Sequence, residues 1–234
     1  MKIVKIFIIN LENRTDRKAE VLNEMIKMKA NDLCEIEVFK AIRPNNELLE
    51  KWNPKFLDPM PLWAIQKNIN PNNYKIGALG CLLSHLTIIQ KSLNLGYENI
   101  LIFEDDAEFL SSEKDLKFII NKYGNFILKF LNNFGIFYLG GNNSKLGMRH
   151  LIENIYLTYG TFTTSSYILN KKCMQFIVDK IIGYPKEIDK FYCELIQPNF
   201  QCITLHPPIV TQRKSYSDIL NQETDYDLKT LKTT

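Results

Sequence analysis

Apolar runs alternate with amphipathic stretches along most of this sequence, an order that predicts an α/β fold. Short runs without a polar residue, such as 100–103, are typical of strands buried on both faces. Longer stretches with apolar residues three and four positions apart are typical of helices with one buried face. The predicted strands are 3–11, 37–42, 100–103, 134–139 and 163–169, with an extended segment at 203–210. The predicted helices are 15–29, 78–94, 114–132, 171–182 and 187–196.

Two segments depart from this pattern. Residues 43–75 are rich in Pro and Asn, and we expect a long irregular connection there, which is usually functional or mobile. Residues 221–234 are polar and offer little to bury, so we expect a frayed tail. The remaining residues, 1–220, are expected to form one domain.

The composition is that of a globular protein with a substantial core, since 45% of the 234 residues are hydrophobic and 24% are charged. The net charge of +3 is small and no basic tract occurs, which argues against nucleic acid as a partner. No stretch approaches the roughly 18 apolar residues of a membrane span, and the first apolar run is too brief for a signal sequence. Scattered cysteines without a C-x-x-C pair indicate reduced thiols. We therefore expect a cytoplasmic protein without a transmembrane segment.

Three adjacent carboxylates, Glu104, Asp105 and Asp106, follow the apolar run 100–103 directly. Clustered negative charges beside a buried strand are costly without a cation, and ligands of open α/β sheets bind beyond the carboxyl ends of the strands. Hard oxygen ligands suit Mg²⁺ or Mn²⁺, which could bridge to a phosphate-bearing ligand. The alternative is an acidic turn that caps the next helix.

The end of the first predicted strand offers a second candidate site. Arg14 and Arg17 follow it and can form two-pronged hydrogen bonds to phosphate at a helix N-terminus. The alternative is that Thr15 or Asp16 caps the helix while both arginines are solvated.

A third candidate is the start of the helix at 78–94, where Gly77 and Gly80 would allow close approach of a ligand. Ser84 and His85 interrupt this apolar helix. His85 could bind a sugar or phosphate, although a lone histidine is more often buried and satisfied by the protein itself.

In the distal half, Asp189 could be a helix cap or a general base. His206 precedes two prolines and is a plausible neutral metal ligand. Gln212, Ser217 and Asp218 suit either ligand contact or a plain turn.

Taken together, these segments resemble glycosyltransferase family 25, which includes lipooligosaccharide galactosyltransferases and collagen hydroxylysine galactosyltransferases. The ordered set is specific, and it covers nearly the whole chain. The matching pieces are IFIINLENRTDR (6–17), GALGCLLSHLTIIQ (77–90), ILIFEDDAEF (100–109), TTSSYILNKKC (163–173), IDKF (188–191) and HPPIVTQ with SDI (206–219).

The resemblance implies a GT-A-type fold, a single Rossmann-like α/β domain whose central mixed β-sheet is flanked by helices. It implies transfer of galactose or glucose from a UDP-sugar, with inversion, to a hydroxyl of a glycan, lipooligosaccharide or hydroxylysine. Mn²⁺ (or Mg²⁺) would be held by Asp106 first, then by Glu104 or Asp105, with His206 as a further ligand. Peripheral attachment to a membrane follows if the acceptor is a lipid. The oligomeric state stays open, with a homodimer as one option.

The resemblance also implies roles for individual residues. Asp189 would take the proton of the attacking hydroxyl, and Asp105 is the second catalytic candidate. Arg17 and the metal would offset charge on the leaving diphosphate. The donor-binding candidates are Asn10, Leu11, Arg14, Arg17, Gly80, Ser84, His85 and Glu104.

Two other functions fit the same acidic cluster. One is a metal-dependent nucleotidyl- or phosphotransferase, for which the sequence offers no GxxxxGKS loop. The other is an inactive domain that binds a sugar nucleotide or a glycan.

Overall fold

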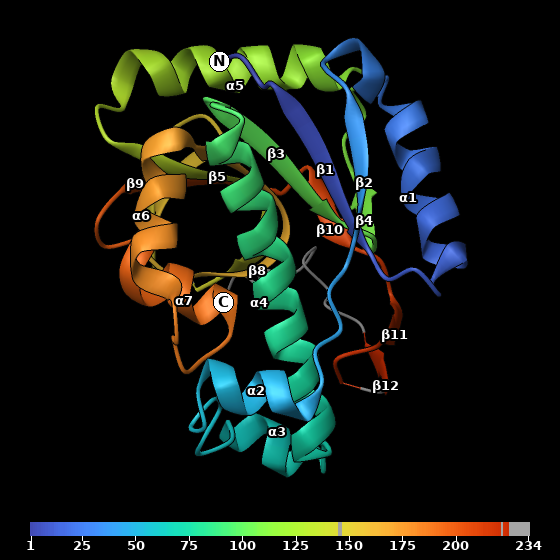
Figure 1. The fold of residues 1–234 in the computed structure, drawn as a ribbon. Coiled ribbons are helices and arrows are strands. Elements are labelled where there is room, and N and C mark those ends of the chain that lie inside the picture. The colour runs from blue at the N-terminus through green and yellow to red at the C-terminus, as the bar shows by residue number, and fades with distance from the viewer. Residues whose placement is uncertain (145–146, 221, 225–234) are drawn as a thin grey trace.

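A central eight-stranded sheet organises the chain (Figure 1). The computed structural model describes residues 1–144, 147–220 and 222–224. The strand order is β2-β1-β3-β8-β5-β9-β7-β6, and two small sheets, β10-β4 and β11-β12, lie beside it. The strands are β1 (Lys5–Asn10), β2 (Ile36–Lys40), β3 (Asn99–Glu104), β4 (Ala107–Phe109), β5 (Phe134–Asn143), β6 (Met148–Ile152), β7 (Ile155–Thr158), β8 (Thr161–Asn170), β9 (Gln201–Leu205), β10 (Val210–Gln212), β11 (Ser215–Ser217) and β12 (Gln222–Thr224).

Strand directions decide where a ligand can bind. Strands β2, β1 and β3 are parallel, so their carboxyl ends lie at one edge of the sheet. Strand β8 is antiparallel to both β3 and β5, so it begins at that same edge. The sheet is therefore mixed, and the predicted α/β class with helices flanking a central mixed sheet is confirmed.

Helices cover both faces of the sheet (Figure 1). Alternate side chains of each strand point to opposite faces, so Phe7 and Ile9 pack under α4 and α6 whereas Ile6 and Ile8 pack under α1 and α5. Both sets are at most 8% exposed, which explains the unbroken apolar runs in the sequence. The helices are α1 (Thr15–Lys27), α2 (Asn46–Trp52), α3 (Leu62–Gln66), α4 (Pro71–Asn94), α5 (Leu116–Phe130), α6 (Lys171–Ile181) and α7 (Ile188–Phe191).

The expectation of an irregular connection over residues 43–75 was wrong. This segment contains α2, α3 and the first turn of α4. Local capping accounts for the difference: Asn45 and Asn70 are N-caps whose side chains accept hydrogen bonds from backbone N–H groups, and Pro71 occupies the first turn of α4. The same Asn and Pro residues that suggested a loop therefore begin helices.

Smaller differences concern the second half of the chain. The hairpin β6–β7 was not predicted, and the segment expected to be extended over 203–210 is divided between β9 and β10. The helix expected over 187–196 is α7 followed by a π-helical turn, Tyr192–Ile196. Of the expected tail, residues 222–224 form β12 and the other residues lie outside the described part of the chain.

Helix α4 also corrects the expectation about membrane spans. Among the described residues it is the one helix long and apolar enough to cross a membrane by length and composition. Its apolar side chains are core residues, such as Leu79, Leu82 and Leu86, each at most 4% exposed. Burial on the sheet is therefore sufficient to explain its hydrophobicity.

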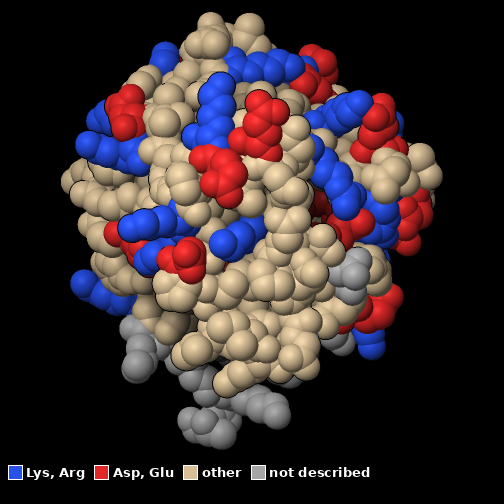
Figure 2. Space-filling view, turned by 60° about the horizontal axis from the view of Figure 1, so that its bottom comes forward, with Lys and Arg blue, Asp and Glu red and all other residues tan. Residues whose placement is uncertain are grey.

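Charges of both signs are mixed on the surface. On the face shown in Figure 2, Lys and Arg side chains alternate with Asp and Glu, with no broad area of one sign among the described residues. This matches the small net charge of +3.

Gly80 fixes how closely the chain after β2 approaches α4. A Cβ atom at this position would lie 2.5 Å from the Ile42 carbonyl oxygen and 3.1 Å from Pro44. Ser84, one turn further along, accepts a hydrogen bond from the Ile42 backbone N–H (2.8 Å) and donates to the Gly80 carbonyl oxygen (2.7 Å). The two residues attach the 41–44 segment to the helix.

We therefore predict that Gly80→Ala destabilises the protein by about 1–3 kcal/mol, even though alanine is the better helix former, because the added methyl group displaces the Ile42 backbone. Urea unfolding of the variant measures the loss. Gln90→Ala, at an exposed position of α4, is the matched control and should change the free energy of unfolding little. Equal stabilities of the two variants would contradict the packing argument.

Candidate active site

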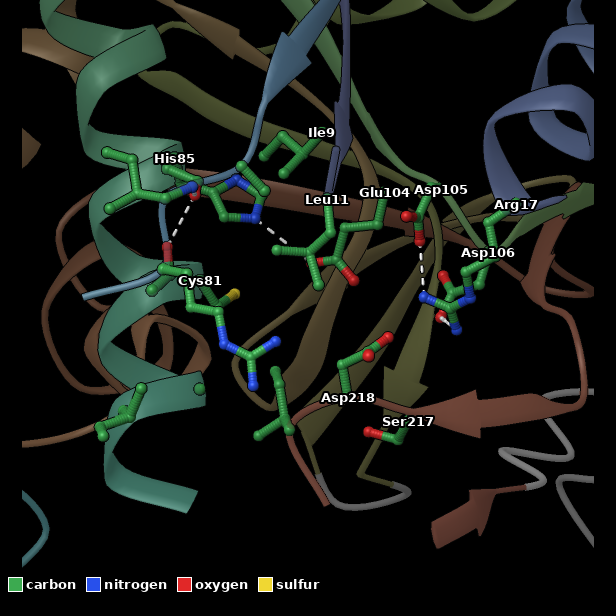
Figure 3. A pocket seen from close by; sticks show the side chains of 18 of the residues that line it. Ile9, Leu11, Arg17, Cys81, His85, Glu104, Asp105, Asp106, Ser217 and Asp218 are labelled. Atoms are coloured by element: carbon green, nitrogen blue, oxygen red, sulfur yellow. Dashed lines mark hydrogen bonds and ion pairs between the residues drawn. The ribbon is translucent and has the colours of Figure 1, made fainter. Parts of the chain in front are cut away.

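A cavity of about 310 Å³ opens where β1 and β3 end (Figure 3). It is lined by the end of β1 with Leu11, by Arg17 of α1, by the 41–44 segment and the first half of α4, and by Gln212 and residues 217–219. The carboxylates that follow β3 complete the wall. The sheet edge expected to bind a ligand therefore carries a cavity lined by the predicted acidic cluster.

Asp105 is the most firmly held of the three acids. One of its oxygens accepts a hydrogen bond from Asn10 Nδ2 (2.7 Å), and the other accepts from Arg17 Nη1 (2.6 Å). Burial raises the pKa of Asp105, and Arg17 and Asn10 oppose that rise. Because both oxygens are engaged, this side chain connects β1, α1 and the acidic cluster.

Asp106 is held more loosely. Its Oδ2 receives long contacts from Arg17 Nη2 (3.4 Å) and Gln212 Nε2 (3.5 Å). Its Oδ1 is buried without a hydrogen-bond partner among the described residues, and so is Gln212 Oε1. Burial and the neighbouring Glu104 charge raise the pKa of Asp106 to about 7. The site therefore contains a carboxylate that is poorly compensated by the protein itself.

Glu104 ends a chain of hydrogen bonds that crosses the core. Its Oε1 accepts from Thr164 Oγ1 (2.6 Å) and lies 3.2 Å from His85 Nε2. The other ring nitrogen, Nδ1, is 2.6 Å from the Tyr167 hydroxyl, which is 3.1 Å from the Tyr192 hydroxyl. Burial raises the pKa of Glu104, but the bonds from His85 and Thr164 outweigh it and leave this pKa below its ordinary value.

The acidic wall fits a divalent metal ion. Asp106 Oδ1 and Gln212 Oε1 are buried oxygen atoms that lack partners among the described residues, and hard cations bind such oxygens. Glu104 adds a second carboxylate on the same wall. The donor set is typical of Mg²⁺ or Mn²⁺.

The structure does not bring His206 to this set. The residues lining the described cavity do not include it, and its ring lies edge-on to Tyr156 of β7 with the ring centroids 6.0 Å apart. The next peptide bond leads into Pro207, and the backbone N–H of His206 is bonded to the Asn154 carbonyl (2.9 Å). We therefore leave His206 out of the metal site.

Several donor-binding candidates have structural partners instead. Arg14 forms an ion pair with Asp218 and another with Asp16 (2.9 Å), and its side chain thereby ties the start of α1 to the residues after β11. The Ser84 hydroxyl accepts from the Ile42 backbone N–H and donates to the Gly80 carbonyl oxygen of α4, and Gly80 is required for the close approach of the 41–44 segment. Leu11 and Asp218 line the cavity.

Asp189 lies near the cluster but not in the cavity lining. One of its oxygens accepts from the Lys190 backbone N–H (2.7 Å), and the other lies 3.5 Å from the Thr163 backbone N–H. Burial and the charge of Glu187 raise the pKa of Asp189. A carboxylate with a raised pKa suits proton abstraction.

Thr163 has a strained backbone at this point, with φ of +69° in a β-branched residue. The next residue, Thr164, directs its hydroxyl to Glu104, while the Thr163 N–H faces Asp189. Backbone strain of this kind is often found at functional sites. Here the strained residue stands between two carboxylates that the sequence had identified separately.

Sequence reasoning missed other cavity residues. Arg43 and Asn73 line the cavity, and Thr164 and Tyr167 hold Glu104 and His85. Arg43 and Asn73 fall in the segment that was expected to be irregular. Alternation along TTSSY puts Thr164 and Tyr167 on opposite faces of the strand, so strand periodicity alone does not predict that both residues hold the Glu104–His85 pair.

A family model matches most of the chain, and curated relatives match about half of it. A family model described as "Glycosyltransferase family 25 (LPS biosynthesis protein)" matches residues 3–192. A "Glycosyltransferase 25 family member" of Aedes aegypti is 30% identical over 112 residues, 47% of this chain and 17% of that protein. Procollagen galactosyltransferase 2 of Mus musculus is 27% identical over 112 residues, 45% of this chain and 16% of that protein. The chain thus spans about a sixth of the length of these relatives.

A solved structure is similar over most of its length. It is a glycosyltransferase involved in the glycosylation of the major capsid of PBCV-1, with 12% identity and a TM-score of 0.46. The alignment covers 86% of this chain and 81% of that chain.

The raised pKa of Asp106 predicts how stability varies with pH in the metal-free protein. The folded state holds a proton up to about pH 7, whereas the ordinary pKa is 3.8, so folding binds a proton between these values. The free energy of unfolding should therefore fall as the pH rises from about 4 to 7. Thermal unfolding across this range should show that decline in the wild type and a flatter profile in Asp106→Asn. Asp179→Asn, on the exposed side of α6, should keep the wild-type profile; an unchanged profile in Asp106→Asn would refute the assignment.

Proposed function

The chain belongs to glycosyltransferase family 25, as its ordered motifs predicted, and we propose from this that it transfers a hexose from a UDP-sugar to an acceptor hydroxyl with inversion. Glycosyl transfer is the activity of the family, whereas the donor, the stereochemistry and the acceptor belong to the proposal. The observation that supports it most directly is the buried Asp106 oxygen without a described partner, beside a cavity at the carboxyl edge of the sheet.

Mn²⁺ or Mg²⁺ would be held by Asp106, with Glu104 and Gln212 as further oxygen ligands. When bound, such an ion offsets negative charge on a diphosphate. Asp105 is assigned a positioning role, because both its oxygens are already bonded to Asn10 and Arg17. This arrangement leaves Asp106 as the acid that is free to change partners.

Arg17 keeps the acidic wall from repelling an anionic donor. It is 9% exposed and forms ion pairs with Asp105 (2.6 Å) and Asp106 (3.4 Å). Arg43 is exposed, lines the same cavity and supplies a second positive charge. A pyrophosphate group would thus meet cationic side chains as well as the acids.

Asp189 is the proposed general base. It would accept the proton of the acceptor hydroxyl as the oxygen attacks the anomeric carbon in line with the departing UDP. The Lys190 backbone N–H donates a short hydrogen bond to one Asp189 oxygen. The other oxygen has only the longer contact with the Thr163 N–H, and it is the one we expect to accept the proton.

The acceptor is proposed to be a saccharide hydroxyl, on a lipooligosaccharide or another glycan, or a hydroxylysine. The first option follows the family description, and the last follows the procollagen galactosyltransferase relative. We propose a cytoplasmic location, with attachment to a membrane surface if the acceptor is a lipid. Selective binding of other nucleotides would instead favour a nucleotidyl- or phosphotransferase, and UDP-sugar binding without turnover would favour an inactive binding domain.

A screen of UDP-sugars for hydrolysis with and without Mn²⁺ tests the donor and the metal without knowledge of the acceptor. We expect one UDP-hexose to be hydrolysed in a Mn²⁺-dependent way. Asp106→Asn should lower kcat by roughly 10²–10³-fold, because a charged ligand is lost, while Asp179→Asn should retain wild-type turnover. Normal turnover of Asp106→Asn with saturating Mn²⁺ would overturn the metal assignment.

Replacing the proposed base should separate chemistry from binding. Asp189→Asn should lower kcat of transfer by about 10²–10⁴-fold, since general-base assistance is lost. Its affinity for UDP, measured by calorimetry, should stay within about twofold of the wild type, because Asp189 does not line the cavity. A loss of UDP affinity with kcat unchanged would assign Asp189 to binding instead.

A further inference from the structure

A second group of metal-ligating side chains lies beside the acidic wall. Cys81 and His85 are one helical turn apart on α4, and Glu104 faces them from the end of β3 (Figure 3). One ligand atom from each of the three residues lies within 4.8 Å of the others. All three residues line the cavity, so an ion can reach them from solvent.

These three donors differ from the oxygen donors of the acidic wall. A thiolate, an imidazole nitrogen and a carboxylate oxygen are the ligands that Zn²⁺ prefers, whereas Mn²⁺ and Mg²⁺ favour oxygen alone. With three protein ligands, a tetrahedral ion would keep a fourth position for water or a bound ligand, as in open zinc sites. The two donor sets therefore favour different kinds of ion.

The residues behind the ligands hold them in place. The Tyr167 hydroxyl lies 2.6 Å from His85 Nδ1, and the Tyr192 hydroxyl continues the chain at 3.1 Å. In the metal-bound state, a proton on Nδ1 donated to Tyr167 would leave the Nε2 lone pair for the ion. Thr164 fixes the Glu104 carboxylate (2.6 Å). Supporting hydrogen bonds of this kind accompany histidine and carboxylate ligands at metal sites.

The charge around Cys81 also favours a cation. Three carboxylates, Glu104, Asp189 and Asp106, lie close enough to Cys81 to act on its charge. The same negative charges attract a divalent ion, and an ion bound to sulfur stabilises the thiolate in turn.

We propose that Cys81, His85 and Glu104 form a binding site for a thiophilic divalent cation, for which Zn²⁺ is the expected ion. Binding forms a bond from the ion to sulfur and releases the thiol proton to solvent, without any oxidation or reduction. It also replaces the contact between His85 and Glu104 by separate bonds to the ion. Because Glu104 is shared with the proposed Mn²⁺ site, an occupied thiophilic site inhibits Mn²⁺-dependent transfer; this last consequence rests on the proposed function.

Cobalt titration of the metal-free protein tests the site, because Co²⁺ replaces Zn²⁺ and reports its own ligands. The wild type should develop a near-ultraviolet absorption band from sulfur-to-cobalt charge transfer, together with tetrahedral visible bands. Stoichiometric Zn²⁺ should abolish both. Cys81→Ala should lack the charge-transfer band, whereas Cys34→Ala, which removes a partly buried thiol at the far side of the sheet, should retain it.

A milder variant keeps the test valid if Cys81→Ala folds poorly. Tyr167→Phe retains all three ligands and should weaken Co²⁺ affinity by roughly 10–100-fold through the loss of the hydrogen bond to His85. Asp106→Asn should keep the Co²⁺ spectrum while it loses Mn²⁺-dependent donor hydrolysis, which separates the two sites. A charge-transfer band that persists in Cys81→Ala, or an octahedral spectrum without one in the wild type, would overturn the proposal.

The outcomes also distinguish this site from the proposed function. A cobalt spectrum that depends on Cys81, in a protein that hydrolyses no UDP-sugar, would support the site and reject the function. Mn²⁺-dependent hydrolysis that Zn²⁺ does not inhibit, in a protein without the cobalt spectrum, would support the proposed function and reject the Cys81 site.

Discussion

Three adjacent carboxylates at the end of β3, two of them buried and Glu104 half-buried, are the constraint on which the rest of the structure depends. Asp105 and Asp106 are 6% and 8% exposed, so their charges cannot rely on water. Arg17 from α1 and Asn10 from β1 compensate Asp105, while His85 from α4 and Thr164 from β8 compensate Glu104. Compensation thus comes from both faces of the sheet and from both neighbouring strands. The Asp106 side chain receives only long contacts from described residues. Its Oδ1 has no described hydrogen-bond partner, and the residue lines the cavity, so a bound ligand or ion could supply that partner.

The packing of α4 follows from the same constraint. His85 reaches Glu104 only if the helix lies close to the sheet edge, and Gly80 and Ser84, in the turn of α4 that precedes His85, hold the 41–44 segment against the helix. Strand β8 meets the cluster from the other side, and the positive φ of Thr163 precedes the threonine that donates to Glu104. The packing of α4 and the irregular backbone at the start of β8 therefore both help to position the Glu104 carboxylate.

The sequence was sufficient to predict the α/β class, the central strands and the acidic edge, because these depend on periodicity and on the direction of parallel strands. It was insufficient for features that depend on tertiary partners. Nothing local distinguishes a serine that holds backbone, such as Ser84, from one that meets a ligand. The Pro- and Asn-rich segment was misjudged because the same residues favour loops and helix starts. His206 was placed in the metal site by analogy, and the order of the strands puts it beside β7.

The distribution of partners around the three acids separates their roles in a way that residue type cannot. A carboxylate with two short protein hydrogen bonds, such as Asp105, gains little from a ligand, since binding would have to break contacts that already offset its burial. A carboxylate with a buried oxygen that lacks a described partner, such as Asp106, gains most from a cation, because the cost of its burial is still uncompensated. Glu104 lies between these cases: its Oε1 faces His85 and Thr164. The acid that the fold compensates least is therefore the one best suited to hold a metal, and the shared acid is the one through which two metal sites would compete.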